Sequence, residues 1–250
     1  DGDSTNNHPM NRPDVLPQAD YQGGDLAGIT QKIKDGYFNQ MGFSTIWMTP
    51  VIQNPLEPYG EQPNPRTKFA GYHGYWPISS TKVDFRFGTD AELQELVKTA
   101  HEHGLNVILD YVANHVHEEH PMFKNDPTIC TPLILPDGSK NIAQWNEHRL
   151  TTWFDEFIPT LDYGRSEIVE TMTDSALYWI EHFGLDGFRH DACKHVPETF
   201  WRTLTKKIKE RVEIPSGKPF YQVGESYGSP QLISSYVNSG MLTGQFDFNV

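Results

Sequence analysis

Apolar residues follow two patterns along this chain, one with the period of a helix and the other nearly continuous. Residues 89–103 carry Leu93, Leu96 and Ala100 on one helical face, and residues 166–183 show the same spacing. Short apolar runs between such segments are typical of strands that are buried on both faces. We predict helices at about 29–41, 89–103, 166–183, 197–212 and 230–237, and strands at 45–48, 106–109, 187–191 and 220–223, with another beginning at 246–250.

The alternation of strands with helices predicts an α/β fold built on a parallel sheet. Asp110, Asp191 and Glu225 each follow directly after a predicted strand. In a closed barrel the carboxyl ends of the strands surround one opening, where active sites are built. An open doubly wound sheet more often carries a glycine-rich phosphate turn, which this sequence lacks. We therefore predict a (β/α)8 TIM barrel, present here in part with about six strands, and an inserted irregular subdomain after the third strand.

Long stretches with no sustained period divide the predicted barrel. The stretch from Tyr111 to Arg165 contains proline, glycine and scattered aromatic residues. We predict a first part of the barrel at 1–110, an inserted subdomain at 111–165 and a continuation of the barrel at 166–250. Because the chain begins inside a polar loop and ends on an apolar run, we also expect it to be a segment of a longer protein.

The composition narrows the set of partners. A formal net charge of −13 disfavours binding to nucleic acid or to anionic membranes. The sequence has no apolar run near the ~18 residues of a membrane span, and no signal peptide is visible. Cys130 and Cys193 lie in dissimilar contexts, and we interpret them as free thiols that do not fix the compartment.

The most informative stretch for chemistry covers residues 187–195. On a strand, Arg189 and Asp191 lie on the same face, so the guanidinium should lower the pKa of Asp191 and keep it ionised. An ionised Asp at a strand end suits the nucleophile of a retaining glycosidase, although an ordinary buried ion pair fits the same pattern. Glu225 has no cation near it in sequence and follows an apolar strand, so burial should raise its pKa and suit a proton donor.

Three short segments resemble the first three signature regions of the α-amylase family of glycoside hydrolases. They are Asp110–His115, Gly187–Asp191 and Val223–Glu225, and they occur in the family's order with matching helices between them. The resemblance extends over essentially all 250 residues. It implies a barrel enzyme that acts on α-glucans, with Asp191 as nucleophile and Glu225 as general acid/base.

By the same resemblance, Arg189 is the partner that keeps Asp191 ionised, and His115 hydrogen-bonds the sugar at the cleaved bond. The segment Tyr72–Trp76 is similar to the family's stacking loop, in which an aromatic ring packs on a sugar face. Lys194–His195 matches the pair that contacts the leaving side of the glucan. Hydrophobic cover for the first segment and a solvated loop for the second are the plainer alternatives. The residues implied to bind substrate are His73, Tyr75, Trp76, His115, Lys194 and His195.

The opening loop is rich in hard oxygen ligands of the kind that Ca²⁺ binds. Such loops are usually turns, but this one resembles a calcium loop of cyclodextrin glucanotransferases and related amylases. The resemblance implies Ca²⁺ as cofactor, with a first site formed by Asp1, Asp3, Asn6, Asn7, Gly23 and Asp25. It also implies a second site formed by Asn114, Asp162 and the backbone carbonyl of His195.

We predict retaining hydrolysis of α-1,4-glucosidic bonds in starch-like glucans or maltooligosaccharides, and we expect an extracellular or periplasmic location. Glucanotransferases carry an aromatic residue where this chain has Ile158, which favours hydrolysis over cyclisation. The family's fourth region, with a third catalytic Asp, would lie beyond Val250, so we expect this segment alone to be inactive. His190 stands where the family is usually apolar, and alternation points its side chain towards the helices.

Three alternatives use the same residues differently. A cyclomaltodextrinase, a neopullulanase or a transglycosylase of the same family would share the catalytic groups. A catalytically silent glucan-binding homologue would keep only the fold, although intact Asp191 and Glu225 argue against it. A barrel metalloenzyme with His115, His190 and Asp191 as ligands is disfavoured, because alternation sends His190 away from Asp191.

Overall fold

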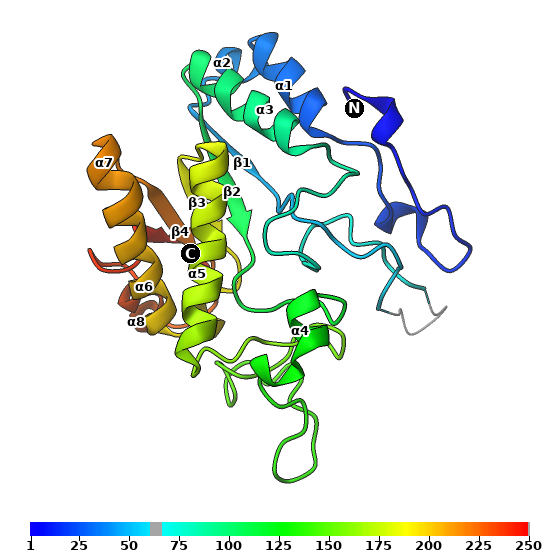
Figure 1. Ribbon diagram of the computed structural model, residues 1–250, viewed down its shortest axis with the longest axis vertical. Helices are drawn as coiled ribbons and strands as arrows, with labels where there is room; N and C mark the ends of the chain where they lie inside the picture. The colour runs from blue at the N-terminus through cyan, green and yellow to red at the C-terminus, as the bar shows by residue number, and fades with distance from the viewer. Residues whose placement is uncertain (61–66, 250) are drawn as a thin grey trace.

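The computed structural model describes residues 1–60 and 67–249, and it contains one parallel sheet (Figure 1). Each strand lies beside the strand that precedes it in the chain, so the order is β1-β2-β3-β4-β5. All four pairings between neighbours are parallel. The strands are β1 (Thr45–Met48), β2 (Asn106–Tyr111), β3 (Gly187–His190), β4 (Tyr221–Gly224) and β5 (Gly244–Gln245).

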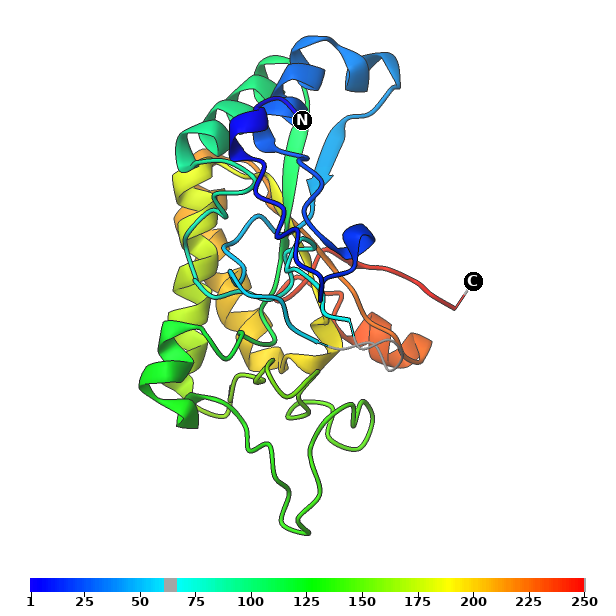
Figure 2. The ribbon, with the colours of Figure 1, turned by 90° about the vertical axis from the view of Figure 1, so that its right-hand side faces the viewer.

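Helices cover one face of this sheet as a layer. α1 packs on α3, α3 on α5, and α5 on α6, and Figure 2 shows α3, α5 and α6 along one side of the strands. A sheet wound in one direction under one layer of helices has the connectivity of a barrel, whereas a doubly wound sheet reverses its strand order. The helices are α1 (Leu26–Lys34), α2 (Tyr37–Gln40), α3 (Asp90–Glu102), α4 (Pro121–Asn125), α5 (Ser166–Phe183), α6 (Glu198–Ile208), α7 (Ile214–Ser216) and α8 (Pro230–Ser235).

Helices α3 and α5 form where the sequence predicts them. The side chain of Thr89 accepts a hydrogen bond from the Glu92 N–H at 3.3 Å, and the Glu92 carboxylate accepts one from the Thr89 N–H at 2.8 Å. This capping box satisfies N–H groups that the start of a helix leaves free. α5 buries nine side chains on its apolar face, including Trp179. No helix in residues 1–60 and 67–249 is long and apolar enough to cross a membrane.

The predicted helix at 29–41 is wrong in extent. The chain forms α1 and α2 instead, and Gly36 separates them in a left-handed conformation with φ 71°, which glycine adopts without steric cost. Ile33 is fully buried, but Tyr37 and Met41 are 47% and 58% exposed. The four-residue spacing of these side chains does not mark one face, because the helix does not continue through Gly36.

Two further expectations need correction. The described residues contain five strands rather than about six, because the chain before α1 forms only 3₁₀ turns at Ser4–Asn6 and Pro17–Ala19. Among the described strands, the long irregular segment follows β2. The helix predicted to Val212 is regular only to Ile208 and continues as a π-helical turn over Lys209–Glu213. Val250, the last residue of the predicted final strand, lies outside the described residues.

The segment 111–165 is tied to the rest of the chain by isolated bridges, such as His115 with Thr160. It contains α4 and a 3₁₀ turn at Pro127–Ile129. Its buried apolar side chains, among them Trp153, belong to the same core as those of the sheet and helices. The segment is therefore anchored beside the carboxyl end of β2, from which it departs.

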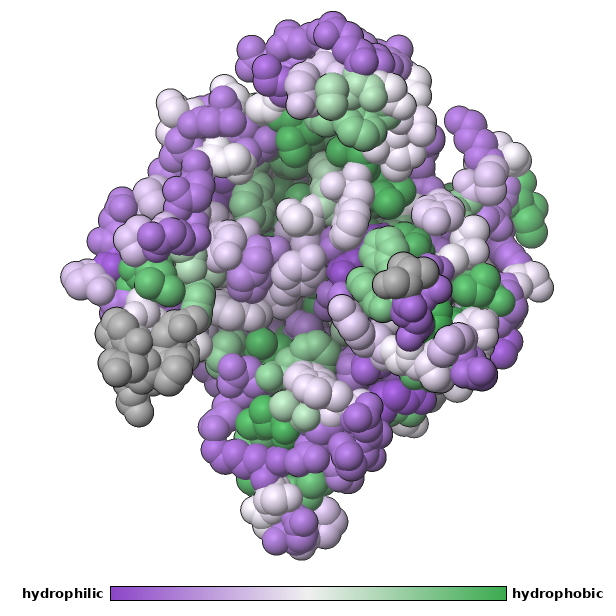
Figure 3. Space-filling model, turned by 180° about the vertical axis from the view of Figure 1, so that it is seen from behind, coloured by the Kyte–Doolittle hydropathy of each residue, from purple (hydrophilic) through white to green (hydrophobic). Residues whose placement is uncertain are grey.

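The two edge strands, β1 and β5, each have one neighbour among the described strands. Beside β1, an apolar hollow of about 610 Å³ is lined by Leu26, Ile46, Met48 and Phe87, among others. Figure 3 shows apolar surface recessed behind a polar rim on this face of the molecule. Leu26 belongs to α1, and Ile46 and Met48 are the two buried residues of β1, so this edge of the sheet is apolar on the side that faces the helices.

His190 lies on the helix side of β3, as alternation predicts. Its side chain is fully buried, and its ring packs on that of Trp201 in α6 with 4.6 Å between centroids. Its Nε2 lies 3.0 Å from Oε1 of Gln222. The Nε2 of Gln222 donates in turn to the hydroxyl of Thr205. Burial lowers the pKa of His190 to about 3. The ring is therefore a neutral hydrogen-bonded link between β3, β4 and α6.

The buried His190 predicts a specific acid sensitivity. A group whose pKa falls from 6.5 to about 3 on folding contributes full stability above pH 6.5 and loses it as the pH falls towards 3. From pH 7 to pH 5 the loss from this group is about 2 kcal/mol of unfolding free energy. His190→Gln keeps the donor but does not titrate, so urea unfolding should show a correspondingly smaller loss in the variant. Equal losses in parent and variant would exclude this role.

Candidate active site

Four charged side chains meet at the carboxyl end of the sheet. Asp110 of β2 lies beside Arg189 of β3 in the strand register. Asp191 and Glu225 are the first residues after β3 and β4, and their N–H groups donate to the neighbouring strand at 3.0 and 2.9 Å. Because each bond fixes the residue just past a strand end, the four side chains share one edge of the sheet.

Arg189 contacts all three carboxylates. Its Nη1 donates to Asp110 Oδ1 and Oδ2 at 2.8 and 3.0 Å and to Asp191 Oδ1 at 2.9 Å. Its Nη2 lies 2.7 Å from Glu225 Oε2. The Arg189 side chain is 7% exposed, whereas Asp191 and Glu225 are 14% and 30% exposed. The structure thus brings Asp191 and Glu225 together on one guanidinium, with both carboxylates reachable from solvent.

One cation lies among three acidic groups, and the pKa values of Asp191 and Asp110 are both shifted upward. Burial and, next, the charge of Asp110 raise the pKa of Asp191 to about 7, although Arg189 acts in the opposite direction. Burial also raises the pKa of Asp110 above its usual value. Arg189 acts on the pKa of Asp191 in the expected direction, but burial and the charge of Asp110 outweigh it, so the pKa of Asp191 lies above its usual value and not below it.

Tyr75 is fixed at both ends to this cluster and its surroundings. Its hydroxyl donates to Asp110 Oδ2 at 2.8 Å, and its carbonyl accepts from His115 Nε2 at 2.9 Å. Burial raises the pKa of the Tyr75 phenol and lowers the pKa of His115 to about 4, so both groups are neutral near pH 7. Tyr75 and His115, both predicted to bind sugar, therefore lie together beside Asp110.

His73 and Trp76 pack around Tyr75 as parts of the same loop. His73 Nδ1 accepts from the Tyr75 N–H at 3.0 Å, and the two rings are stacked with 5.8 Å between centroids. Trp76 makes edge contacts with His73 at 4.5 Å and with Phe157 at 5.1 Å. These contacts connect the loop to segment 111–165 and pack its aromatic rings against their neighbours.

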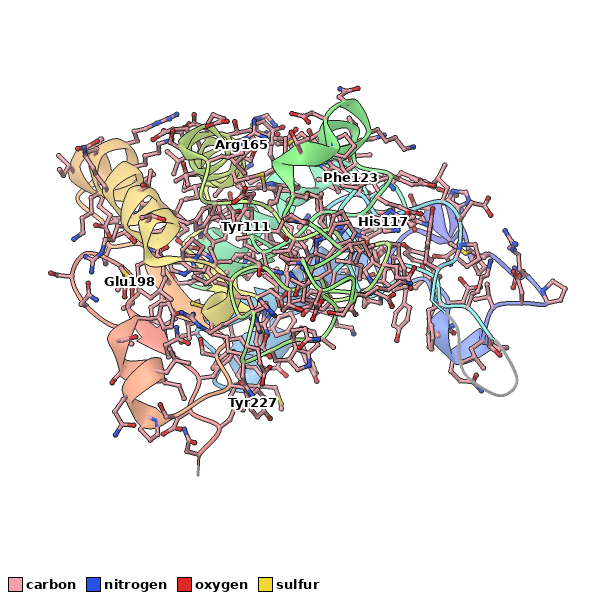
Figure 4. The ribbon with its side chains drawn as sticks, turned by 90° about the horizontal axis from the view of Figure 1, so that it is seen from below. Tyr111, His117, Phe123, Arg165, Glu198 and Tyr227 are labelled. Carbon is pink, nitrogen blue, oxygen red and sulfur yellow. The ribbon has the colours of Figure 1, made fainter. Side chains whose placement is uncertain are left out.

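Lys194 and His195 lie on the other side of the cluster, next to Glu225. His195 is buried and its Nδ1 donates to the Arg149 carbonyl at 2.7 Å. A hollow of about 430 Å³ opens here. Seen from below, Tyr227 lies at the edge of the molecule, away from Phe123 and Arg165 (Figure 4). The hollow is lined mainly by Trp145, Phe154, Lys194, His195, Glu225 and Tyr227.

The oxygen-rich opening loop is gathered around Asp25, which caps α1. Asp25 Oδ1 accepts from the N–H groups of Gly2 and Gly28 at 2.8 and 2.6 Å, and Oδ2 accepts from the Asp3 N–H at 2.8 Å. The Asp3 carboxylate is bound to the hydroxyl and N–H of Thr5. Backbone and hydroxyl donors thus occupy Asp3 and Asp25, two of the three carboxylates of this loop that we expected to be calcium ligands.

Other oxygen atoms of this loop have no such donors. The Oδ1 atoms of Asn6 and Asn7 are buried and have no hydrogen-bond partner within the described residues. Asn7 Nδ2 donates to Asp1 Oδ2 at 2.9 Å, and Gly23 lies so close that a Cβ atom there would be 2.7 Å from Asn7 Oδ1. Buried acceptors without donors suit a bound cation, so Asp1, Asn6, Asn7 and Gly23 fit the predicted calcium loop.

Asn114 presents a similar unpartnered oxygen at the start of segment 111–165. Its Nδ2 faces His115 Nδ1 at 3.4 Å and Thr160 Oγ1 at 3.5 Å, whereas its buried Oδ1 has no partner in the described part of the chain. Its carbonyl accepts from the Leu161 N–H at 3.0 Å, which places Asp162 nearby. No three His, Cys, Asp or Glu side chains among the described residues converge to hold a metal ion. A cation here would need amide and carbonyl oxygens, which Ca²⁺ accepts.

Asp110 in the cluster and Trp47 beside it were given no catalytic or binding role from the sequence. Asp110 carries the same signal as Asp191 and Glu225, since it directly follows a buried apolar run. The Trp47 ring lies 5.4 Å from the guanidinium carbon of Arg189. Alternation along β1 turns Trp47 away from the two buried residues of that strand, and this signal could have placed it on the inner face.

The family follows from comparison with known proteins. The chain matches the family described as alpha amylase, catalytic domain, over residues 1–131 and 137–250. It belongs to this family. The catalytic domain of the family is a (β/α)8 barrel, so the predicted family and fold class are confirmed, and the five strands are part of such a barrel. Enzymes of the alpha-amylase family often bind calcium.

Individual relatives are similar over only part of their length. The alpha-amylase of Streptomyces lividans is 28% identical, and the match covers 91% of this chain and 30% of the relative. The cyclomaltodextrin glucanotransferase of Geobacillus stearothermophilus is 32% identical over 82% of this chain and 29% of the relative. The crystal structure of the alpha-amylase from Geobacillus thermoleovorans, complexed with acarbose, aligns with a TM-score of 0.73 at 34% identity, covering 95% of this chain and 47% of that one. The chain thus spans less than half the length of these proteins.

The shared guanidinium predicts a large stability effect in the complete protein. Arg189→Gln leaves three partly buried carboxyl groups without a cation, so the unfolding free energy should fall by about 3–5 kcal/mol at pH 7. Urea unfolding measures the change. The deficit should shrink as the pH falls to 5, because protonated carboxyl groups need no counter-charge.

The exposed pair of Arg211 with Glu181 provides the matched control. Arg211→Gln should lower the unfolding free energy by less than about 1 kcal/mol. Similar losses in the two variants, or a loss in Arg189→Gln that does not depend on pH, would contradict a buried charge cluster.

Proposed function

We propose that the complete protein is a retaining glycoside hydrolase that cleaves α-1,4-glucosidic bonds in starch-like glucans and maltooligosaccharides. One observation carries this proposal: the carboxylates of Asp191 and Glu225 both contact the guanidinium of Arg189. Retention at the anomeric carbon needs two carboxyl groups close enough to act on one glycosidic bond. Membership of the alpha-amylase family supports the same reaction class.

In this mechanism Asp191 attacks the anomeric carbon, and its carboxylate forms a bond to that carbon as the glycosidic C–O bond breaks. Glu225 gives its proton to the leaving oxygen and then, as a carboxylate, accepts a proton from the water that hydrolyses the glycosyl-enzyme. Asp191 must be ionised for the first step. Burial raises its pKa to about 7, and the contact with Arg189 favours the charged form that the attack requires.

The neighbouring side chains provide places for sugar on both sides of the cleaved bond. The half-buried ring of Tyr75, held by Asp110 and His115, suits packing against a pyranose face. The hollow beside Glu225, with Lys194 on its wall, suits the leaving part of an α-glucan chain. Because starch is too large to cross a membrane, we also propose that the protein acts outside the cytoplasm, in an extracellular or periplasmic location.

A second candidate is transfer of the glucosyl group to another sugar instead of to water. The aromatic walls of the 430 Å³ hollow, Trp145 and Phe154, favour it, because they could hold an acceptor sugar next to Glu225. Ile158 is buried at a position where glucanotransferases carry an aromatic residue, and this favours hydrolysis. Product analysis on starch, pullulan and cyclodextrin distinguishes an amylase from a cyclomaltodextrinase, a neopullulanase or a transferase.

We further propose that Ca²⁺ stabilises two places in the fold. Asn114 Oδ1 points to one of them, with Asp162 and the carbonyl of His195 as further ligands, and the orphaned oxygens of Asn6 and Asn7 support the other. Bound calcium would be coordinated by these buried amide oxygens, which have no hydrogen-bond donor among the described residues. At the first place, the orientation of Asn114 also fixes the ring of His115, which binds the Tyr75 carbonyl.

The catalytic proposal is tested by Asp191→Asn and Glu225→Gln in the complete protein. Each should lower kcat on maltoheptaose by on the order of 10³-fold or more, because each removes a group that acts in bond cleavage. NMR of the first product should show the α-anomer. Glu198→Gln, which removes an exposed carboxylate on α6, is the control and should keep full activity. Turnover by Asp191→Asn, or a β-anomeric first product, would exclude the mechanism.

The calcium proposal is tested by Asn114→Ala. If the parent gains about 2.7 kcal/mol at a hundredfold excess of Ca²⁺ over its Kd, the variant should gain clearly less, and a calorimetric titration should show one fewer binding equivalent. Asn39→Ala removes a surface amide bound to the His103 carbonyl and should bind calcium as the parent does. Equal stoichiometry in Asn114→Ala would remove Asn114 from the ligand set.

A further inference from the structure

The buried side-chain amide of Asn54 forms hydrogen bonds with the backbone on both sides of Tyr75. Asn54 is fully buried in the irregular stretch that follows β1. Its Oδ1 accepts from the Trp76 N–H at 2.8 Å, and its Nδ2 donates to the Gly74 carbonyl at 3.1 Å. Nδ2 also donates to the Ile52 carbonyl at 2.8 Å. The side chain of Asn54 thus bonds to the residue before Tyr75 and to the residue after it.

The loop that carries Tyr75 passes unusually close to its support. Gly74 has a left-handed φ of 87°, and a Cβ atom there would lie 2.2 Å from the Pro50 carbonyl oxygen. A Cβ atom at Gly71 would lie 2.8 Å from the Cβ of Asn54. The turn from Gly71 to Gly74 is closed by one hydrogen bond of 3.0 Å. These close approaches restrict the backbone of the loop to one position against Asn54, and the side-chain amide of Asn54 determines that position.

Asn54 is itself held by a buried ion pair. Asp84 and Arg86 are 0% and 4% exposed and form a bidentate contact of 2.8 and 2.6 Å. Asp84 Oδ2 accepts from the Asn54 N–H at 3.0 Å, and Arg86 Nη2 donates to the Asn54 carbonyl at 2.9 Å. The Tyr21 ring covers the guanidinium at 4.0 Å. Both backbone polar groups of Asn54 are therefore clamped by charges that water does not reach.

The chain of contacts leads from this anchor to the reacting groups. Tyr75 donates its hydroxyl to Asp110, and Asp110 binds Arg189, which holds Asp191. Within the described residues, Asn54 has no hydrogen bond to any of these three charged residues; it acts through Tyr75. Catalytic geometry is sensitive to displacements of about 1 Å, which can lower rates by ~10²-fold.

We propose that Asn54, clamped by Asp84 and Arg86, is the positioning residue that places the Tyr75 hydroxyl on Asp110 and the Tyr75 ring in the sugar site. This inference rests on the proposed glycosidase function, because it assigns Tyr75 a role in holding substrate. Asn54 supports the loop that carries Tyr75 and makes no hydrogen bond to Asp110, Arg189 or Asp191 among the described residues. Its effect on catalysis therefore has to disappear when the Tyr75 side chain is absent.

The experiment is a double-mutant cycle in the complete protein with Asn54→Ser and Tyr75→Ala, using a chromogenic maltotrioside as substrate. Asn54→Ser should lower kcat/KM by about 10- to 100-fold in the parent. In the Tyr75→Ala background the same substitution should change kcat/KM by less than about 2-fold, because the residue through which Asn54 acts is gone. Equal losses in both backgrounds would overturn the proposal.

Controls distinguish positioning from a general loss of stability. Ile33→Ala removes a fully buried side chain of α1 and should lower the Tm while leaving kcat/KM within about 2-fold of the parent, at a temperature well below every Tm. If Ile33→Ala loses as much activity as Asn54→Ser, the effect of Asn54 is stability and the proposal is wrong.

A crystal structure of Asn54→Ser provides a readout that does not depend on activity. The Tyr75 hydroxyl should no longer lie within hydrogen-bond distance of Asp110 Oδ2; an unchanged Tyr75 would exclude Asn54 as its anchor. A parent protein that cleaves no maltooligosaccharide would instead refute the proposed function. A displaced Tyr75 in Asn54→Ser would still establish the anchor in that case, so the two failures remain separate.

Discussion

The guanidinium of Arg189 is the constraint on which the charged edge of this sheet depends. It joins residues from the ends of β2, β3 and β4, whose carboxylates would otherwise repel one another in a partly buried space. A lysine could not reproduce this arrangement, because one ammonium lacks the planar fork that serves several oxygens at once. Strand pairing brings the three strand ends together, and the guanidinium allows their acidic groups to remain there.

The sequence predicted well those features that depend on residues near one another in the chain. The capping box of Thr89 and Glu92 spans three positions, and the buried stripe of α5 repeats within one turn, so both are visible as local patterns. The strand-end positions of Asp191 and Glu225 also follow from local patterns. The pKa of Asp191 does not, because burial and, next, the charge of Asp110 raise it, and Asp110 bonds to Arg189 from 79 residues away. Nor does the break at Gly36, because a glycine inside an apolar period looks the same in a continuous helix.

The irregular stretches were the least predictable, and the reason is physical. Asn54 contacts Gly74 and Trp76 from 20 and 22 residues away, and Arg86 reaches the Asn54 carbonyl from 32 residues away. None of these spacings has a period that a pattern could reveal. Burial of Asp84 and Arg86 contradicts their polarity, and only their pairing makes it tolerable. Such a pair is weak evidence for stability, but it restricts the backbone to one arrangement, and a loop that presents an aromatic ring needs that restriction.

The winding of the sheet also affects how this architecture can diversify. Helices α3, α5 and α6 support the strands from one side, and segment 111–165 leaves the sheet at β2 and extends to one end of the molecule (Figure 2). Near its tip, the stretch between Ile134 and Lys140 is joined by one isolated bridge, and Ile134 is 53% exposed. Residues can be inserted or deleted at such a tip without disturbing the packed layers. Changes of length at this tip would therefore alter how far the segment extends from the sheet and would leave the charged cluster at its base unchanged.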